Sequence, residues 1–322
     1  MRGSLMRLFT PEQHKQILRK HTRNIDAAAA YSALAQKEIS RQLVRYWRQI
    51  FIDNDGNLAK TDRALKEMRK YIKPQPDDDI GPDLFLPERA ERILVIPDQH
   101  MPYHHPDMIP FLVAVRDHFK PDLVVNLGDE LDHHAMSFHD SDPNLDSAGI
   151  ELEKALPTLH ALEREFPQML ICHSNHGSMS FRRAKAHGVP VQYLKRYRDV
   201  LFPNGGGDGW HWAYAWRIDT DLGPVMFKHQ SSASIVSDAA HNQANVVVGH
   251  HHGKFSVEYA ASSAALYYGM YCGCLIDKDS LAFAYGKHTQ YKPIVGCAVI
   301  LNGVPTLIPM LLDREGRRVG SL

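Results

Sequence analysis

The sequence predicts an α/β protein, a layered sandwich of two mixed sheets with helices, preceded by a small all-helical domain. Two observations predict the sandwich: strand-length apolar runs alternate with helical patterns from Arg92 onward, and mixed strands follow from Gly253. A third, the basic helical character of the first 73 residues, predicts the separate domain. The 322 residues are enough for one large domain and one small one.

The net charge is zero overall but differs between the two parts of the chain. Residues 1–73 carry 16 Lys and Arg against 7 Asp and Glu, whereas residues 74–322 carry 21 against 30. These counts give net charges of +9 and −9, and a basic domain beside an acidic one indicates an anionic partner. We divide the chain into a basic domain (1–73), a stiff linker with four prolines (74–90) and a larger domain (91–322).

Cysteine usage and apolar run length indicate the compartment. Four cysteines do not make a disulfide framework, so we expect all of them to be reduced and structural. No apolar run approaches the ~20 residues that a membrane span needs, and the first residues lack a signal-peptide core. We expect a cytoplasmic protein with no membrane partner, and the sequence leaves the oligomeric state open.

The basic domain is predicted to hold three helices, followed by a fourth at 61–72. The first helix begins with Thr10 at its N-cap, Pro11 at its first position and Gln13 at its third, which together make a capping box with a proline start. The second and third helices span about 25–35 and 41–51. The segment from Ser40 to Trp47 resembles the recognition helix of helix-turn-helix domains, which implies that its arginines contact DNA. These are Arg41, Arg45 and Arg48. The alternative is a packing module whose arginines only face solvent.

Five predicted strands of the larger domain end in residues of the types that bind metals. Four are apolar runs at 92–96, 123–127, 169–172 and 246–248, and a hairpin of 212–218 with 224–228 supplies the fifth. Ligands gather at the carboxyl ends of strands in α/β sheets. The residues that follow these strands are Asp98, His100, Asp129, Asn175, His176, His229, His250 and His252. Helices are predicted at 106–119, 150–166, 191–201 and 232–242, and further strands at 255–259, 281–285, 295–301 and 306–312.

The chemistry of these residues indicates a pair of cations. Seventeen of the 20 histidines lie between His100 and His252. Two divalent ions about 3.5–4 Å apart need a bridging carboxylate and open positions for water and substrate. Imidazole, carboxylate and amide ligands without cysteine suit such ions and argue against a structural zinc site. We expect two divalent ions, with Mn favoured and Fe, Zn, Co or Mg as alternatives.

The ordered motifs Asp98-x-His100, Gly128-Asp129-x-x-Asp132, Asn175-His176, His229 and Gly249-His250-x-His252 resemble those of the calcineurin-like metallophosphoesterases. The resemblance covers roughly residues 92–312 through these motifs, and it implies an α/β/β/α sandwich. It implies one ion held by Asp98, His100 and His252, and a second held by Asn175, His229 and His250. It also implies that Asp129 bridges the ions and that His176 lies beside the scissile phosphate.

The sequence departs from the family pattern in three places. Ser174 and Gly177 replace the usual glycine and acidic residue around the Asn-His motif, so the acidic side chain that normally supports the catalytic histidine is absent beside His176. His133-His134 stands where phosphomonoesterases often have an arginine, which favours a diester substrate. Asp132 is expected to hold its loop rather than a metal.

A second basic segment lies between the third and fourth motifs. Its cations alternate with aromatic residues and are predicted to contact a nucleic-acid backbone; they are Arg182, Arg183, Lys195, Arg196 and Arg198. The alternative is the solvated face of an amphipathic helix.

Together, the two basic segments and the metal motifs favour a two-metal phosphodiesterase, a DNA nuclease that uses a hydroxide bridging the ions, with Asp129 and His176 as catalytic residues. The alternatives are a phosphatase acting on a monoester, phosphoprotein or cyclic nucleotide, and a non-catalytic DNA-binding or assembly protein.

Overall fold

The computed structural model describes residues 8–53, 80–81, 84–138, 142–231, 234–263, 265–283, 292–320 and 322. The chain separates into two compact units, Met1–Lys73 and Pro74–Leu322. The helix predicted at 61–72 lies outside the described residues. Among the described residues, no helix has the length and apolar character needed to cross a membrane.

The described part of the first unit is helical. It contains helices α2 (Pro11–Lys20), α3 (Asn24–Ala35) and α4 (Arg41–Arg48) and the π-helical turn η1 (Gln49–Asp53). These are the helices that the sequence predicts. The capping box at the start of α2 is confirmed, because Thr10 and Gln13 exchange side-chain to backbone hydrogen bonds. The core is built from one face of each helix and includes Leu18, Tyr31, Val44, Trp47 and Ile50.

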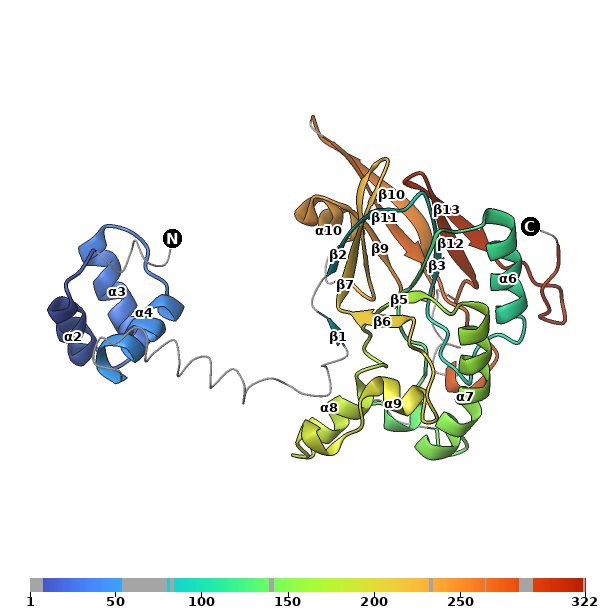
Figure 1. Cartoon of the computed structure of the whole chain (residues 1–322), viewed down its shortest axis with the longest axis horizontal. Coiled ribbons are helices and arrows are strands. Elements are labelled where there is room, and N and C mark those ends of the chain that lie inside the picture. Colours follow the sequence, from blue (N-terminus) through green and yellow to red (C-terminus); the bar gives the residue numbers. More distant parts are fainter. Residues whose placement is uncertain are drawn as a thin grey trace. The chain divides into compact units, whose positions relative to one another are not determined.

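Two mixed sheets form the second unit (Figure 1). The seven-stranded sheet has the order β1 (Ile80–Gly81), β6 (Trp210–Ala213), β5 (Met169–Cys172), β4 (Leu123–Asn126), β3 (Arg92–Ile96), β12 (Gly296–Leu301) and β13 (Val304–Pro309). The six-stranded sheet has the order β10 (Phe255–Ala261), β11 (Leu266–Cys272), β9 (Asn245–Val248), β8 (Gly223–Lys228), β7 (Ala215–Thr220) and β2 (Leu84–Arg89). Strands β3, β4, β5 and β6 run parallel, as do β8 and β9.

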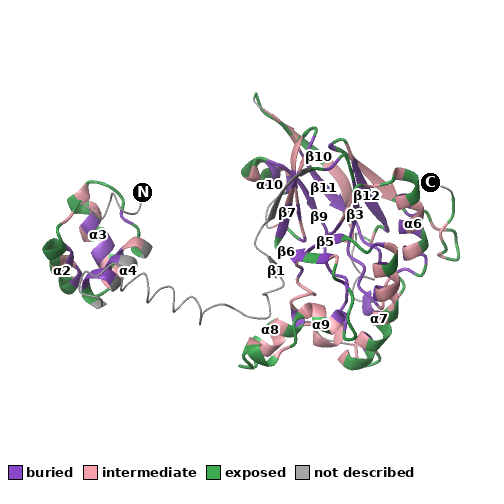
Figure 2. Ribbon diagram, viewed as in Figure 1, coloured by how far each residue is buried: buried purple, intermediate pink, exposed green. Residues whose placement is uncertain are grey.

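Helices cover the outer faces of both sheets, as Figure 1 shows. Strand β3 illustrates the layering, because Ile93 and Val95 enter the core between the sheets, whereas Leu94 and Ile96 pack toward helices α6 (Met108–Phe119) and α7 (Ala148–Glu165). Helix α10 (Ile235–Asn242) covers the other sheet. Figure 2 shows the strands as the most buried part of this unit. The predicted α/β architecture with two mixed sheets is confirmed.

Shorter elements lie around the sheets. They are the 3-10 turns η3 (His134–Met136) and η4 (Val191–Tyr193) and the helices α8 (Met179–Ala186) and α9 (Tyr197–Leu201). The helix predicted at 191–201 is therefore wrong as one element. It divides into η4 and α9 because Leu194 is extended, and Tyr193 is exposed rather than packed.

Two strand predictions in the middle of the chain need correction. The strand predicted at 212–218 is two strands, because the chain leaves one sheet for the other at the half-exposed Tyr214: Trp212 pairs with Ile171, whereas Trp216 pairs with Phe227. Within the linker predicted at 74–90, residues 80–81 and 84–89 are strands. Strand β2 tolerates Pro87 because it lies at a sheet edge and its register shifts there.

The strand predicted at 281–285 is also wrong in its described part. Residues 281–283 form a turn, in which the Phe283 N–H donates to the Ser280 carbonyl. Residues 284–285 lie outside the described residues. Strand β11 is not among the predicted strands. The four cysteines are buried and form no disulfide, as predicted.

Candidate metal centre

The predicted metal ligands meet at the carboxyl ends of strands from both sheets. Strands β3, β4 and β5 lie side by side in one sheet, and β8 and β9 are neighbours in the other. Short loops that follow these strands bring the polar residues together. These loops carry Asp98, His100, Asp129, Asn175, His229, His250 and His252. We call this group of seven side chains the metal centre.

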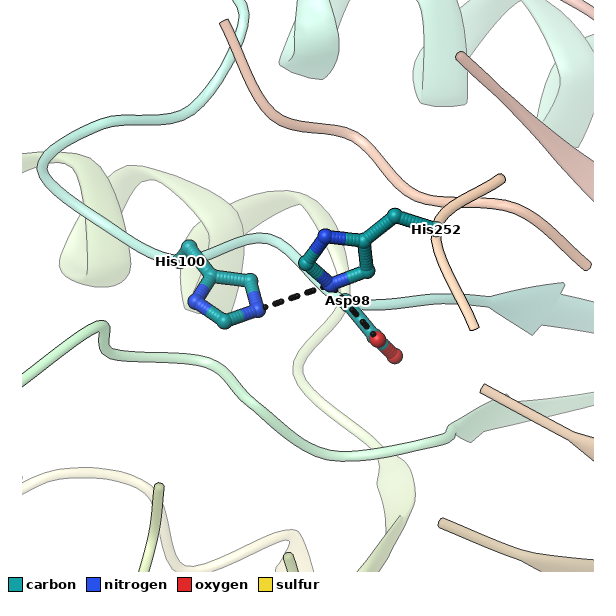
Figure 3. Close-up of side chains that lie close together, drawn as sticks. All are labelled: Asp98, His100 and His252. Carbon is teal, nitrogen blue, oxygen red and sulfur yellow. Dashed lines mark hydrogen bonds and ion pairs between the residues drawn. The ribbon is translucent and has the colours of Figure 1, made fainter. Parts of the chain in front are cut away.

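The first ligand group consists of Asp98, His100 and His252. Figure 3 shows the three side chains pointing toward one another. His252 Nε2 lies 3.1 Å from His100 Nε2 and 3.2 Å from Asp98 Oδ2. The ligand atoms of the group all lie within 4.8 Å of one another, which is close enough for a single cation to contact all three.

The second group consists of Asp129, His229, His250 and Asn175. Ligand atoms of the first three lie within 4.8 Å of one another, and Asn175 Oδ1 is 2.7 Å from His229 Nε2. Asp129 connects the two groups, because its Oδ2 atom lies 3.4 Å from His100 Nε2 and 3.3 Å from His229 Nε2. This placement is what a carboxylate shared by two cations requires.

The hydrogen bonds of the ligands show that the group fits a metal. The Leu127 carbonyl can only accept, so His229 Nδ1 carries the proton at 2.9 Å and the neutral ring turns an Nε2 lone pair inward. His100 does the same through Nδ1, which lies 2.6 Å from Asp132 Oδ1. Asp98 Oδ1 is buried and has no hydrogen-bond partner among the described residues. Lone pairs that face one another in a buried site repel unless a cation lies between them, so this arrangement fits a bound metal ion.

Without a cation, the same negative charge draws protons onto the histidines. Burial lowers the pKa of His100, but hydrogen bonds and charge from Asp129 and Asp132 outweigh it and raise that pKa to about 10. Burial is likewise outweighed at His229, where the charge and hydrogen bond of Asp129 raise the pKa to about 9. The pKa of Asp129 stays well below its ordinary range, because the charges of His229 and His176 outweigh burial. Buried negative charge thus dominates the electrostatics of the centre.

The backbone is strained at the metal centre. His100, Asp129, His133 and His250 have φ between 52° and 64°, in the left-handed region. The other non-glycine residues with positive φ end helices or lie in the turn at Asn302, so these four need a different reason. Strain of this kind is concentrated at functional sites, where it fixes side-chain direction.

Two glycines let the loops approach closely. A Cβ atom on Gly249 would lie 2.2 Å from Asp98 Oδ1, so only glycine leaves room for that carboxylate. Gly128 has φ +96°, and a Cβ atom there would lie 2.5 Å from the Cys172 carbonyl oxygen. Both glycines precede ligand residues, so the glycine of each motif has a steric role.

Asp132 and His176 border the metal centre. The Asp132 carboxylate binds His100, and its carbonyl accepts a hydrogen bond from His176 Nδ1. The His176 backbone N–H donates to Asp129 Oδ1 at 3.1 Å. The Asp132 carbonyl therefore orients the His176 ring, although the neighbouring Gly177 has no side chain to support it.

Sequence reasoning missed two buried carboxyl groups near the centre. Glu130 accepts a hydrogen bond from Trp212 Nε1 at 2.7 Å, and Glu151 accepts from the backbone N–H groups of His134 and Ala135 at 3.0 and 3.2 Å. Burial raises the pKa of each to about 7. Glu151 thereby anchors the loop after Asp132. No local pattern distinguishes these residues from exposed glutamates.

The residues predicted to contact nucleic acid lie in or next to helices α4, α8 and α9, and none of them is one of the seven residues of the metal centre. Arg41, Arg45, Arg182, Lys195 and Arg196 are exposed. Three others are bound within the protein. Arg48 donates to the Leu18 and His21 carbonyls and to Asn24. Arg183 donates to the Met136 and Ser137 carbonyls, and Arg198 to those of Gly207 and Trp210.

Comparisons with known proteins give only distant matches. No family model and no curated protein matches the chain. Among solved structures, Yfce, a phosphoesterase from E. coli, is 8% identical, with a TM-score of 0.34 over 72% of this chain and 98% of that chain. Vps29 from Chaetomium thermophilum is 12% identical, with a TM-score of 0.36 over 72% and 94%. Vacuolar Protein Sorting 29 from Cryptosporidium parvum is 12% identical, with a TM-score of 0.34 over 66% and 85%. At TM-scores below 0.5, these likenesses carry no argument about this chain.

Proposed function

We propose that the protein is a metal-dependent phosphoric diester hydrolase that cleaves nucleic acid, with DNA as the favoured substrate. The observation that carries the proposal is the position of Asp129, which lies between two ligand groups and within 3.4 Å of a histidine nitrogen in each. Two-ion sites of this kind are used for in-line displacement at phosphorus. The motif resemblance to calcineurin-like metallophosphoesterases supports the same chemistry.

Each ligand has a defined part in the proposal. Asp98, His100 and His252 would hold one divalent ion, Asn175, His229 and His250 the other, and Asp129 would contact both. When bound, such ions supply Lewis acidity and lower the pKa of water toward neutrality. Asp132 holds the His100 ring through Nδ1, so that Nε2 stays directed at the ion position.

His176 is the residue that would act on the leaving group. Its Nδ1 atom is bound to the Asp132 carbonyl, which fixes the ring and leaves Nε2 to meet the substrate. The side chain is 21% exposed, so a substrate oxygen can reach it. From this position the ring, when it is also protonated at Nε2, can donate that proton to the departing oxygen or stabilise charge on the phosphoryl group.

Two features support nucleic acid over a small ester. Residues 1–73 carry a net charge of +9, and Arg41 and Arg45 are exposed on α4. We propose that this helix docks on duplex DNA, whose backbone such side chains neutralise. The double variant Arg41→Gln/Arg45→Gln should lower the salt slope of duplex binding by about 1.8. Lys278→Gln, an exposed cation of the second unit, is the matched control.

A substrate panel with added Mn tests the proposed reaction. We expect hydrolysis of bis-p-nitrophenyl phosphate and of DNA, faster than that of p-nitrophenyl phosphate, and loss of both activities in Asp129→Ala. A faster rate on the monoester would indicate a phosphatase instead. Binding of DNA without hydrolysis of any ester would indicate a non-catalytic DNA-binding protein.

A further inference from the structure

An exposed basic and aromatic surface adjoins the loops of the metal centre. It consists of Phe138, Arg182, Lys185, Tyr193 and Lys195, and we call it the α8 surface. All five are exposed, Phe138 by 47% and Tyr193 by 81%. Helix α8 packs against both η3, which ends two residues before Phe138, and η4, which contains Tyr193, and Figure 2 shows exposed residues along α8.

The α8 surface is connected to the metal centre by short segments of chain. Helix α8 begins at Met179, three residues after His176, and Phe138 follows Asp132 by six residues. Both connections start at residues that border the centre. A polymer held on this surface is therefore held beside the place where a phosphodiester would be cleaved.

The charge of this region is opposite to that of the unit around it. Residues 179–198 contain six Lys and Arg and no Asp or Glu, whereas residues 74–322 as a whole carry a net charge of −9. A polyanion is repelled by an acidic body and attracted where the cations gather. The sign of the charge selects a polyanionic partner.

The aromatic ring of Phe138 is held in place although it is exposed. Arg183 donates to the Met136 carbonyl at 2.7 Å and to the Ser137 carbonyl, which fastens the loop to α8. The guanidinium carbons of Arg183 and Arg182 lie 4.3 and 4.9 Å from the Phe138 ring centroid. Because these contacts already fix the ring, its exposed part can stack on a base with little further loss of motion.

We propose that the α8 surface binds single-stranded nucleic acid and leads the strand into the metal centre, an inference that rests on the proposed function. Bases in a duplex are stacked on one another and cannot lie on a protein ring, whereas unpaired bases can. Phe138 and Tyr193 would stack on bases while Arg182, Lys185 and Lys195 follow the phosphates. The surface thus has the two components of single-strand binding, aromatic faces and a row of cations.

Fluorescence anisotropy with the full-length protein tests the inference. The probes are a labelled 20-nucleotide single strand, the corresponding duplex, and phosphatidylserine vesicles, all in EDTA to prevent cleavage. Phe138→Ala and Tyr193→Ala should each weaken single-strand binding about fivefold or more, with little effect on the duplex. Phe138→Tyr and Tyr193→Phe should retain binding, and Tyr259→Ala is the control, because this tyrosine on β10 is also exposed, by 56%.

The cations give a second readout. Arg182→Gln/Lys185→Gln should lower the slope of log affinity against log salt by about 0.7 for each charge removed. The inference is overturned if the aromatic variants bind the single strand as Tyr259→Ala does, if duplex binding falls equally, or if only vesicle binding is lost. Hydrolysis of bis-p-nitrophenyl phosphate by the wild type reports separately on the proposed function, since that diester is too small to need the surface.

Discussion

The metal centre and the α8 surface differ in how their polar side chains are held. In the centre, buried groups hold one another: His100 lies between Asp132 and Asp129, and His229 between the Leu127 carbonyl and Asn175. On the α8 surface, Arg182 and Lys185 are exposed, and the Phe138 ring that Arg182 contacts is itself exposed. A preorganised buried site loses much when one member is changed, whereas exposed cations act additively and are screened by salt.

The same division occurs among the arginines of each basic segment. Arg48 and Arg183 donate hydrogen bonds to backbone carbonyls and so have a structural role, whereas Arg41, Arg45 and Arg182 are exposed. Composition alone therefore overstates the number of cations that are free to meet a ligand.

The largest effect is expected at the carboxylate shared by both ligand groups. Asp129→Ala should lower kcat/KM on bis-p-nitrophenyl phosphate by at least about 10³-fold, because it removes a ligand from both ion positions at once. Steady-state assays with Mn measure it. Asp117→Ala, an exposed aspartate on α6, should keep the wild-type rate. Near-normal activity of Asp129→Ala would contradict the shared-carboxylate arrangement.

The next effect concerns the residue that orients the ligands. Asp132→Ala should weaken Mn binding by about 10–100-fold, since His100 loses the group that holds its Nδ1 proton and ring direction. Calorimetric titration measures the affinity, and Asp279→Ala, which is exposed, serves as the control. Unchanged affinity would mean that the His100–Asp132 hydrogen bond has no part in metal binding.

Within the first unit, replacing the hydrogen-bonded Arg48 should lower stability more than replacing the exposed Arg45. Arg48→Ala removes three hydrogen bonds from a charged donor and should destabilise the helices by about 2 kcal/mol. Arg45→Ala should stay within about 0.5 kcal/mol of the wild type. Hydrogen exchange of the α2 to α4 amides measures both. Equal protection of these amides from exchange in the two variants would show that the hydrogen bonds of Arg48 do not stabilise the helices.

The smallest effect is a pH dependence from Glu151. Burial raises its pKa from 4.5 to about 7, so the folded protein binds this proton more tightly than the unfolded chain. Its contribution to stability is complete below pH 4.5 and is lost as the pH rises through 7. Glu151→Gln cannot ionise, so its Tm relative to the wild type should rise between pH 5 and pH 8. A constant difference across this range would show that Glu151 does not titrate there.

The sequence predicted features that depend on neighbours in the chain. A buried run such as Ile93–Ile96 followed by Asp98 and His100 is a local pattern that can be read from the sequence. Because the carboxyl ends of parallel strands lie at the same edge of a sheet, the residues that follow such strands are expected to lie close together. The split at Tyr214 was missed because apolar residues continue on both sides of it. Strand β2 was missed because prolines and aspartates around it favour a linker, and only its partner β7 makes it a strand.

Features that depend on distant partners could not be predicted. Glu130 is buried because Trp212, 82 residues later, donates to it, and Glu151 because its carboxylate meets two N–H groups of another loop. Whether the guanidinium groups of Arg48, Arg183 and Arg198 bind within the protein likewise depends on which backbone carbonyls the fold brings near them. Residue type suggested a nucleic-acid contact for each, whereas the fold gives their guanidinium groups acceptors inside the protein.

Metal stoichiometry tests the central claim most directly. After loading with Mn and removal of excess metal, elemental analysis of the wild type should give two ions per chain, and Asp129→Ala should give fewer. Two ions in the wild type with a loss in the variant would support a pair of cations held through one aspartate. A wild-type protein that retains no Mn, Fe, Zn or Co under any loading condition would contradict it.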